Sequence, residues 1–330
     1  MIHADLKLVE NLFDLKVVGQ AATRDGFGKG LIEAGEKDSR VVVLCADLAE
    51  STRVLAFKEK FPERYIEVGV AEQNLATVAS GLAIYGKIPF ITSYATFSPG
   101  RNNEQIRTTI SLNNVPVKIA GAHAGVSVGP DGATHQALED IALMRVQPNM
   151  TVVYPCDAEE ARKATVVAAF NGKPTYLRFA REKTPIMTTV ETPFEIGKAL
   201  VLWEGSNPQA VIIACGPLVY QALIAAKELA GEGVETLVIN NHTIKPLDKD
   251  TLVEAARRAG AVVTVEEHQI MGGMGSAVAE MLAQECPVPI EFIGMHDEFG
   301  QSGKPEELIE HYSLGASAIK RAVQKSIGRK

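Results

Sequence analysis

The chain has 330 residues, of which 46% are hydrophobic and 22% charged, enough apolar material for two hydrophobic cores. Its formal net charge is −7, and the absence of a basic run argues against nucleic acid and anionic membranes as partners. Four well-separated cysteines without a CxxC pair, and no recognisable signal peptide or long apolar segment, predict a cytoplasmic protein with free thiols.

The first half of the chain predicts alternating strands and helices. Residues 1–20 have no strong pattern and predict a lead-in arm, followed by a helical stretch that contains Arg24. The continuous apolar run at 41–48 is typical of a buried parallel strand. Further strands are predicted at 65–70, 88–92, 115–120, 150–154 and 175–179, with helices near 101–113, 136–146 and 157–170. This alternation favours a mostly parallel sheet covered on both faces.

The second half predicts another α/β unit. A segment richer in Pro and Thr, near residues 185–208, interrupts the alternation, so we predict a first domain at 1–190, a linker at 191–208 and a second domain at 209–330. Apolar strand patterns and helical patterns alternate again in the second domain. The fold class is therefore α/β, with two doubly wound domains. The glycine turn MGGMGSAV lacks the third glycine of GxGxxG, which favours a tight turn over a dinucleotide site.

Glu72 lies where the short strand at 65–70 passes into a helix of small residues. A carboxylate at a helix start commonly caps the helix and interacts favourably with its dipole. The helical run at 75–83, however, has no charged residue and is typical of a helix buried on all sides. Glu72 is therefore expected to enter a dry interior and to need a specific partner there.

A second dense group of polar residues occupies the segment AHAGVSVGPDGATHQALED, at residues 122–140. The preceding strand would bring His123 to the edge of the sheet, and a Gly- and Pro-rich loop would present Asp131 and His135. A neutral imidazole can give and take a proton at physiological pH. A purely structural hydrogen bond would explain either histidine alone, whereas the spacing of the whole group favours function.

Two of these segments resemble a known family. The run GVAEQNLATVASGLA resembles the signature of the pyrimidine-binding domain of transketolase and its thiamine-diphosphate-dependent relatives, and the loop GPDGATHQ resembles the donor-sugar loop of transketolase. The resemblance spans nearly the whole chain and the C-terminal half of a full-length transketolase. It implies the C-terminal subunit of a split transketolase, with a pyrimidine-binding domain and a transketolase C-terminal domain, which transfers a two-carbon ketol unit between sugar phosphates in the pentose phosphate pathway.

The resemblance implies a set of cofactor contacts. Glu72 would bind N1′ of the aminopyrimidine of thiamine diphosphate and help that ring to take the proton from the thiazolium carbon. Tyr94 and Phe97, three residues apart, would hold the flat ring, although the family more often has Phe at the position of Tyr94. Asp47 and Leu48 would lie beside the thiazolium ring.

The resemblance also implies substrate contacts. His123 and His135 would act as catalytic groups on the sugar hydroxyls and carbonyl oxygen, and Asp131 would bind the hydroxyl next to the carbonyl. Arginine offers a planar fork that matches a phosphate group. The positions that would grip the sugar phosphate are Arg24, Ser51 and Arg181.

The sequence lacks the GDG…N motif through which thiamine-diphosphate enzymes hold the diphosphate and a divalent cation. The resemblance therefore implies no metal ligand in this chain. It places the ligands of Mg²⁺ or Ca²⁺ on an N-terminal transketolase subunit, with a dimer of this chain inside a heterotetramer.

Three alternatives stay open. A 1-deoxy-D-xylulose-5-phosphate synthase shares the GxAEQ run, a DGxTHQ loop and a segment similar to EEHQIMGGMGSAV, but subunit organisation and the ADLAES and ALEDIALMR stretches favour transketolase. The beta subunit of a 2-oxo acid dehydrogenase shares GxAEQ but not the THQ loop. A non-catalytic α/β binding module is disfavoured, because Glu72, His123, Asp131 and His135 are all retained.

Overall fold

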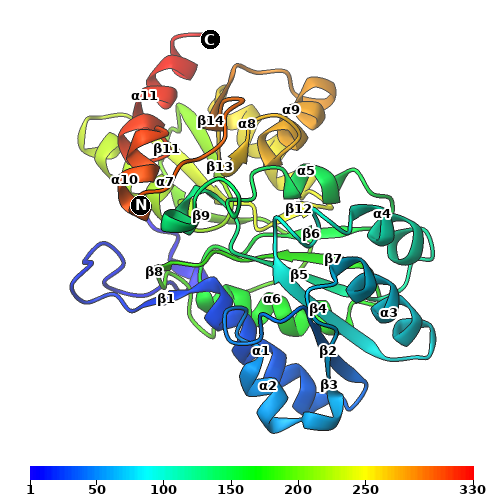
Figure 1. Ribbon diagram of the computed structural model, residues 1–330. Coiled ribbons are helices and arrows are strands. Elements are labelled where there is room, and N and C mark those ends of the chain that lie inside the picture. Colours follow the sequence, from blue (N-terminus) through cyan, green and yellow to red (C-terminus); the bar gives the residue numbers. More distant parts are fainter.

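The computed structural model describes residues 1–330, except for the side chain of Ala4, and contains two α/β domains (Figure 1). The first sheet has seven strands in the order β12-β6-β7-β5-β4-β2-β3, parallel except where β12 pairs with β6. Its strands are β2 (Val41–Cys45), β3 (Tyr65–Glu67), β4 (Ile88–Tyr94), β5 (Lys118–Ala122), β6 (Thr151–Val153), β7 (Thr175–Arg178) and β12 (Thr243–Lys245). The sheet confirms the α/β fold class predicted from the alternating pattern.

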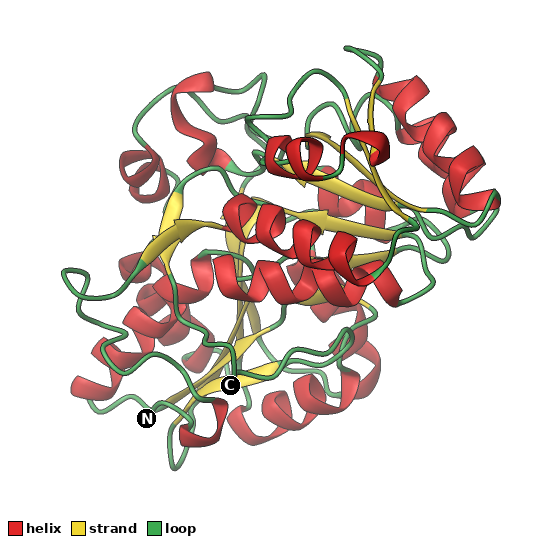
Figure 2. Cartoon of the chain, turned by 90° about the horizontal axis from the view of Figure 1, so that it is seen from below, coloured by secondary structure: helices red, strands yellow, loops and turns green.

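Helices cover both faces of the first sheet, as Figure 2 also shows. They are α1 (Thr23–Lys37), α2 (Leu55–Lys60), α3 (Glu72–Ile84), α4 (Asn103–Gln105), the π-helical turn η3 (Ile106–Ser111), the short helix η4 (Val126–Asp131), α5 (Asp140–Arg145) and α6 (Ala158–Phe170). Side chains alternate between the faces of a strand. Val41 and Val43 of β2 accordingly pack in the core that contains α1 and α6, whereas Val42 and Leu44 pack in the core that contains α3.

The second sheet has five strands in the order β14-β13-β10-β11-β9, parallel except for β9 beside β11. Its strands are β9 (Leu200–Glu204), β10 (Ala210–Ala214), β11 (Thr236–Asn240), β13 (Val262–Gln269) and β14 (Ile290–Met295). Its helices are α7 (Leu218–Gly231), α8 (Lys249–Ala259), α9 (Met274–Glu285), α10 (Pro305–His311) and α11 (Ala316–Ile327). Both domains are therefore of the predicted doubly wound type.

The two domains are interleaved along the chain. Strand β12 lies in the second half of the sequence but joins the edge of the first sheet. Conversely, the N-terminal arm, with the short helix η1 (Ala4–Leu6), packs on the second domain, where Leu12 is buried and Ile2 pairs with Trp203. The chain then enters the first domain through β1 (Gln20–Ala22), which pairs with β8 (Lys183–Pro185).

Several predicted elements end elsewhere in the structure. The strand expected at 65–70 ends at Glu67, because Gly69 has a positive φ of 69°, and the strand expected at 41–48 ends at Cys45, before Asp47 with φ of 59°. The domain boundaries stay predictions, but the linker expected at 191–208 contains β9, which pairs with β11. The Pro- and Thr-rich composition obscured this strand, whose side chains at 200, 202 and 203 are buried.

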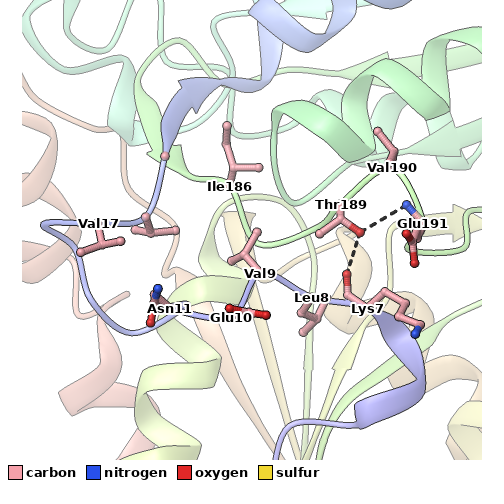
Figure 3. Close-up of a pocket in the computed structure, with 12 residues that line it drawn as sticks. Lys7, Leu8, Val9, Glu10, Asn11, Val17, Ile186, Thr189, Val190 and Glu191 are labelled. Carbon is pink, nitrogen blue, oxygen red and sulfur yellow. Dashed lines mark hydrogen bonds between the residues drawn. The ribbon is translucent and has the colours of Figure 1, made fainter.

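A cavity of about 610 Å³ lies between the N-terminal arm and the segment 186–191 (Figure 3). The hydroxyl of Thr189 donates to the carbonyl oxygen of Lys7, and the N–H of Glu191 donates to that hydroxyl. None of the residues predicted to bind cofactor or substrate lines this cavity. Among the described helices, none combines the length and apolar character needed to cross a bilayer.

Candidate active site

The carboxyl ends of four neighbouring strands carry predicted site residues. In sheet order β3, β2, β4 and β5, these strands lead into Glu72, Asp47, Tyr94 and His123 respectively. Because the four strands are parallel, their carboxyl ends meet at one edge of the sheet, where open α/β folds bind their ligands. The topology alone therefore gathers residues that are up to 76 positions apart, from Asp47 to His123.

Glu72 begins α3, and its side chain is 1% exposed. Its Oε2 accepts a hydrogen bond from Arg101 Nη1 at 2.7 Å, and its Oε1 lies 3.4 Å from the donating hydroxyl of Ser93. Asn102 donates through Nδ2 to the main-chain carbonyl of Glu72 at 2.9 Å. The specific partner that a buried carboxylate requires is thus Arg101, whose own side chain is 49% exposed.

An aromatic cluster adjoins this ion pair. The guanidinium of Arg101 lies 4.9 Å from the ring centre of Phe97, which stacks on Tyr94 with 6.0 Å between centroids. The Tyr94 ring is 3.9 Å from the ring of His123, and His135 meets the rings of Tyr94 and Phe97 edge-on at 5.8 and 5.4 Å. Contacts therefore run without a gap from Glu72 to the two histidines.

His123 follows β5 with φ of 56°, and its side chain is 2% exposed. Burial, reinforced by the charges of Arg24 and Arg181, lowers the pKa of His123 to about 3, so the imidazole is neutral at physiological pH. Arg24 Nη1 lies 3.3 Å from His123 Nε2, and because arginine can only donate, Nε2 is the acceptor. The proton is then on Nδ1, a buried atom without a hydrogen-bond partner among the described residues.

Three arginines lie at this end of the site and differ in how their charge is compensated. Arg53 is neutralised by Asp25 at 2.7 Å, and Arg181 lies 3.3 Å from Glu182 while donating to the carbonyl oxygen of Val128 at 2.8 Å. Arg24 forms no ion pair with a carboxylate among the described residues; its Nη1 donates to the main-chain carbonyl of Ser51 at 2.8 Å. Burial, followed by repulsion from Arg53, lowers the pKa of Arg24.

The remaining predicted residues are less closely tied to the cluster. His135 is half-buried, with Nδ1 at 2.9 Å from the hydroxyl of Thr134, and Asp131 is exposed, with no hydrogen bond from its carboxylate to any described residue. Asp47 is exposed and Leu48 half-buried. Ser51 meets Arg24 through its main chain, so its hydroxyl has no part in that contact.

Two acidic or basic side chains near the site were missed by the sequence analysis. Arg101 stands in the same segment as Phe97 but 29 positions from Glu72, so only the fold reveals the ion pair.

Glu67 accepts hydrogen bonds from the Tyr65 hydroxyl at 2.6 Å and from the N–H groups of Asp47 and Gly69 at 2.8 and 3.0 Å. Although burial opposes its charge, these donors lower the pKa of Glu67. Glu67 thereby fixes the turn after β2 relative to β3.

The described residues contain no group of three or more His, Cys, Asp or Glu side chains arranged to hold a metal ion. The polar groups that converge here are instead one paired carboxylate, a neutral imidazole and an arginine without a carboxylate partner. Such a set suits a flat heteroaromatic ring at one end and an anionic, oxygen-rich molecule at the other.

Comparisons with known proteins agree with this geometry. Residues 19–187 match the family model of the transketolase pyrimidine-binding domain, and residues 197–319 match that of the transketolase C-terminal domain. The 6-deoxy-6-sulfo-D-fructose transketolase subunit SqwH of Clostridium sp. (strain MSTE9) is 39% identical over 93% of this chain and 95% of that protein. A putative transketolase C-terminal section of Methanocaldococcus jannaschii is 41% identical over 92% and 96%.

A solved structure described as a split gene transketolase, inactive beta4 tetramer, superposes with a TM-score of 0.87. It is 45% identical and covers 94% of this chain and 99% of its own. The two halves of the chain match the pyrimidine-binding and C-terminal domains of transketolase in that order, and subunits of split transketolases match along nearly their full length. The chain therefore belongs to the transketolase family.

Proposed function

We propose that this chain is the C-terminal subunit of a split, thiamine-diphosphate-dependent transketolase that moves a two-carbon ketol unit between sugar phosphates. The observation that carries the proposal is the continuous set of contacts from Glu72 through Arg101, Phe97 and Tyr94 to His123 and Arg24. This set joins a ring-binding region to an anion-binding region within one site.

The residues at the Glu72 end fit the aminopyrimidine of thiamine diphosphate. Phe97 and Tyr94 offer a flat aromatic surface, and the buried carboxylate of Glu72 offers an oxygen for a ring nitrogen. Thiamine diphosphate, when bound, supplies the electron sink for cleavage beside the carbonyl. Arg101 then has to leave Glu72 or share it with the ring, and its half-exposed side chain has room to move into solvent.

The residues at the His123 end fit a sugar with a terminal anion. His123 Nδ1–H is a preorganised donor for a substrate oxygen, because it is buried and has no protein partner among the described residues. The guanidinium of Arg24 binds the terminal phosphate, with Arg181 adding positive charge. Asp131 and His135, on the loop above, contact the sugar hydroxyls.

A partner chain supplies what this chain lacks. We propose that an N-terminal subunit carries the diphosphate site and the Mg²⁺ or Ca²⁺ ligands, and that two copies of each chain form the working heterotetramer in the cytoplasm. The similar protein described as an inactive tetramer of a single chain type supports the inactivity of this chain on its own.

Reconstitution tests the proposal. The purified chain is assayed alone and with its N-terminal partner, thiamine diphosphate and Mg²⁺, using xylulose 5-phosphate as donor and ribose 5-phosphate as acceptor. We expect ketol transfer only in the mixture. Ketol transfer by the chain alone would overturn the split-site proposal, and no transfer in the mixture would overturn the assignment to these substrates.

The donor panel decides between transketolase and the alternatives. Since a similar protein is named for 6-deoxy-6-sulfo-D-fructose, the panel includes that sulfonated sugar, whose terminal anion Arg24 would also bind. Pyruvate with glyceraldehyde 3-phosphate tests the 1-deoxy-D-xylulose-5-phosphate synthase reaction in the same mixture. Turnover of pyruvate in place of ketose phosphates would replace the transketolase assignment.

A further inference from the structure

Strand β13 carries two adjacent buried carboxylates, Glu266 and Glu267, each 1% exposed. Successive side chains of a strand point to opposite faces. Glu266 serves its own domain, because its carboxylate accepts the N–H groups of Met274 and Gly275 at the start of α9, at 2.6 and 2.8 Å. Glu267 serves the other domain, because its Oε1 accepts the N–H of Ser127.

Ser127 belongs to the loop at residues 125–136, which connects His123 to His135. The loop fits closely against Glu267: Gly125 has φ of 91°, and a Cβ added there would lie 2.4 Å from the carboxyl carbon of Glu267. Only glycine can therefore occupy this position without a shift of the loop or of the carboxylate.

Further contacts from the second domain hold the same loop. Gln136 donates through Nε2 to the carbonyl oxygen of Gln301, in the second domain, at 3.0 Å and, within the loop, to that of Val126 at 3.1 Å. Near the middle of the loop, Pro305 packs closely on Gly129: a Cβ added to Gly129 would lie 3.1 Å from the Pro305 side chain. The second domain therefore holds the loop that presents the predicted substrate residues, although it contributes none of those residues itself.

The burial of Glu267 calls for a reason. Removing a carboxylate from water is costly unless it gains specific hydrogen bonds, and burial raises the pKa of Glu267. Arg178, fully buried, pairs with Asp140 at 2.7 Å and also donates to the main-chain carbonyl of Glu267 at 2.9 Å. The main chain of Glu267 is thereby tied to the first domain, while its side chain reaches the loop.

We propose that Glu267 is a positioning residue, through which the second domain holds Ser127 and so places Asp131 and His135 over the candidate active site. The substrate side of this statement rests on the function proposed above. The mechanical side, that one carboxylate orders the loop, does not depend on that function.

Hydrogen–deuterium exchange of the chain alone tests the mechanical side. Glu267→Ala should speed amide exchange in the peptides covering 125–136 by about tenfold or more, because a hydrogen bond to a buried carboxyl group is lost. Glu267→Gln keeps the acceptor oxygen and should restore slow exchange. Glu266→Ala is the matched control, since it should speed exchange at the start of α9 and leave 125–136 unchanged. Unchanged loop exchange in folded Glu267→Ala would overturn the proposal.

Kinetics of the reconstituted complex tests the substrate side. Glu267→Ala should lower kcat/KM at least tenfold, and Glu267→Gln should recover most of that loss. If Glu267 only stabilised the fold, Glu266→Ala would lower thermal stability and kcat/KM as much as Glu267→Ala does. Faster loop exchange with unchanged kcat/KM would overturn the positioning role. An inactive wild-type complex would instead overturn the proposed function, and loop exchange would still decide the mechanical side.

Discussion

At the scale of single residues, charge compensation separates the side chains proposed to bind substrate from those that stabilise the fold. Asp140 and Arg178 are both buried and neutralise each other at 2.7 Å, which is the arrangement of a structural pair. Arg24, half-buried and without a carboxylate partner among the described residues, keeps its charge available. We therefore expect Arg24 to contribute more to the proposed anion binding than Arg181, which has Glu182 beside it.

Replacing Arg24 should weaken binding of the phosphorylated substrate. In the reconstituted complex, Arg24→Ala should raise KM for a phosphorylated aldose about 10- to 100-fold, since a charge-assisted hydrogen bond to the phosphate is lost, and should change KM for the unphosphorylated aldose little. Arg53→Ala is the control, because Arg53 is already paired with Asp25. Steady-state kinetics with both aldoses measures the difference, and equal losses for the two would contradict the phosphate role.

Replacing Glu72 should remove activity with little loss of fold. Glu72→Gln should lower the rate of ketol transfer about 10²- to 10⁴-fold, the usual size of a proton-transfer contribution. Arg101 is half-exposed, so water can solvate it once the carboxylate is gone, and thermal unfolding should shift only modestly. Activity of the reconstituted complex and the thermal midpoint of the chain are measured together; full activity would exclude Glu72 from the chemistry.

Sequence patterns predicted some features of the site and missed others for physical reasons. The position of Glu72 after a strand and before an uncharged helix predicted its burial, which the structure confirms. The expectation that this helix is buried on all sides was wrong, because Thr77 is exposed. Its partner Arg101 could not be predicted, since the contact depends on how the segment after β4 folds back on α3. Most strands were predictable from apolar runs, although β9 was missed. Strand ends were not predictable, because the turn after β2, where Asp47 has a positive φ and donates its N–H to Glu67, depends on the neighbouring strand β3.

At the scale of elements, glycines set the distance between helices α1 and α6. A Cβ on Gly26 would lie 1.8 Å from the carbonyl oxygen of Ala158, and one on Gly30 would lie 2.5 Å from that of Arg162. The two helices therefore pack backbone to backbone. Since Arg24 stands in the first turn of α1, this packing also places Arg24 beside the site.

A methyl group at Gly26 should disturb this packing. Gly26→Ala should lower the free energy of unfolding by about 1–3 kcal/mol, because the added carbon overpacks a contact with rigid backbone. Gly81→Ala is the matched control: Gly81 is also helical, but nothing lies within 4 Å of its added Cβ, so the free energy should rise by about 0.5–1 kcal/mol. Urea unfolding of both variants measures the two changes, and similar values would refute the packing argument.

At the scale of the whole molecule, one hydrophobic core joins the two domains. It runs from α3 and the first sheet to α8, α9 and the second sheet, so neither domain buries that face alone. The segment from β11 to β12 crosses between the sheets at His242, whose carbonyl oxygen accepts the N–H of Tyr154 at 2.8 Å. The His242 ring packs at a tilt against Phe194, with 4.4 Å between centroids, and is fully buried.

The burial of His242 should add an acid-sensitive contribution to the stability of the joined molecule. Burial lowers the pKa of His242 to about 3, against 6.5 for an ordinary histidine, so as the pH falls below 6.5 the unfolded chain takes up a proton that the folded chain refuses. The free energy of unfolding must then fall, by about 2 kcal/mol for this one residue between pH 7.5 and 5.0. Burial raises the pKa of Glu160 and Glu266 to about 7, and these groups act in the opposite direction.

The contribution of His242 can be isolated by difference. His242→Asn cannot titrate but keeps a polar group near the Thr243 hydroxyl, 2.9 Å from Nδ1 of the native ring. The substitution leaves a cavity, which lowers the free energy of unfolding by the same amount at every pH. Only the titration of His242 makes the difference between the two proteins depend on pH, because Glu160 and Glu266 contribute equally to both. Urea unfolding at pH 7.5 and 5.0 should therefore show an acid-induced loss that is about 2 kcal/mol smaller in the variant than in the native chain. If acid lowered the free energy of unfolding equally in the variant and the native chain, the segment that crosses between the two sheets at His242 would have to open to water before the protein unfolds.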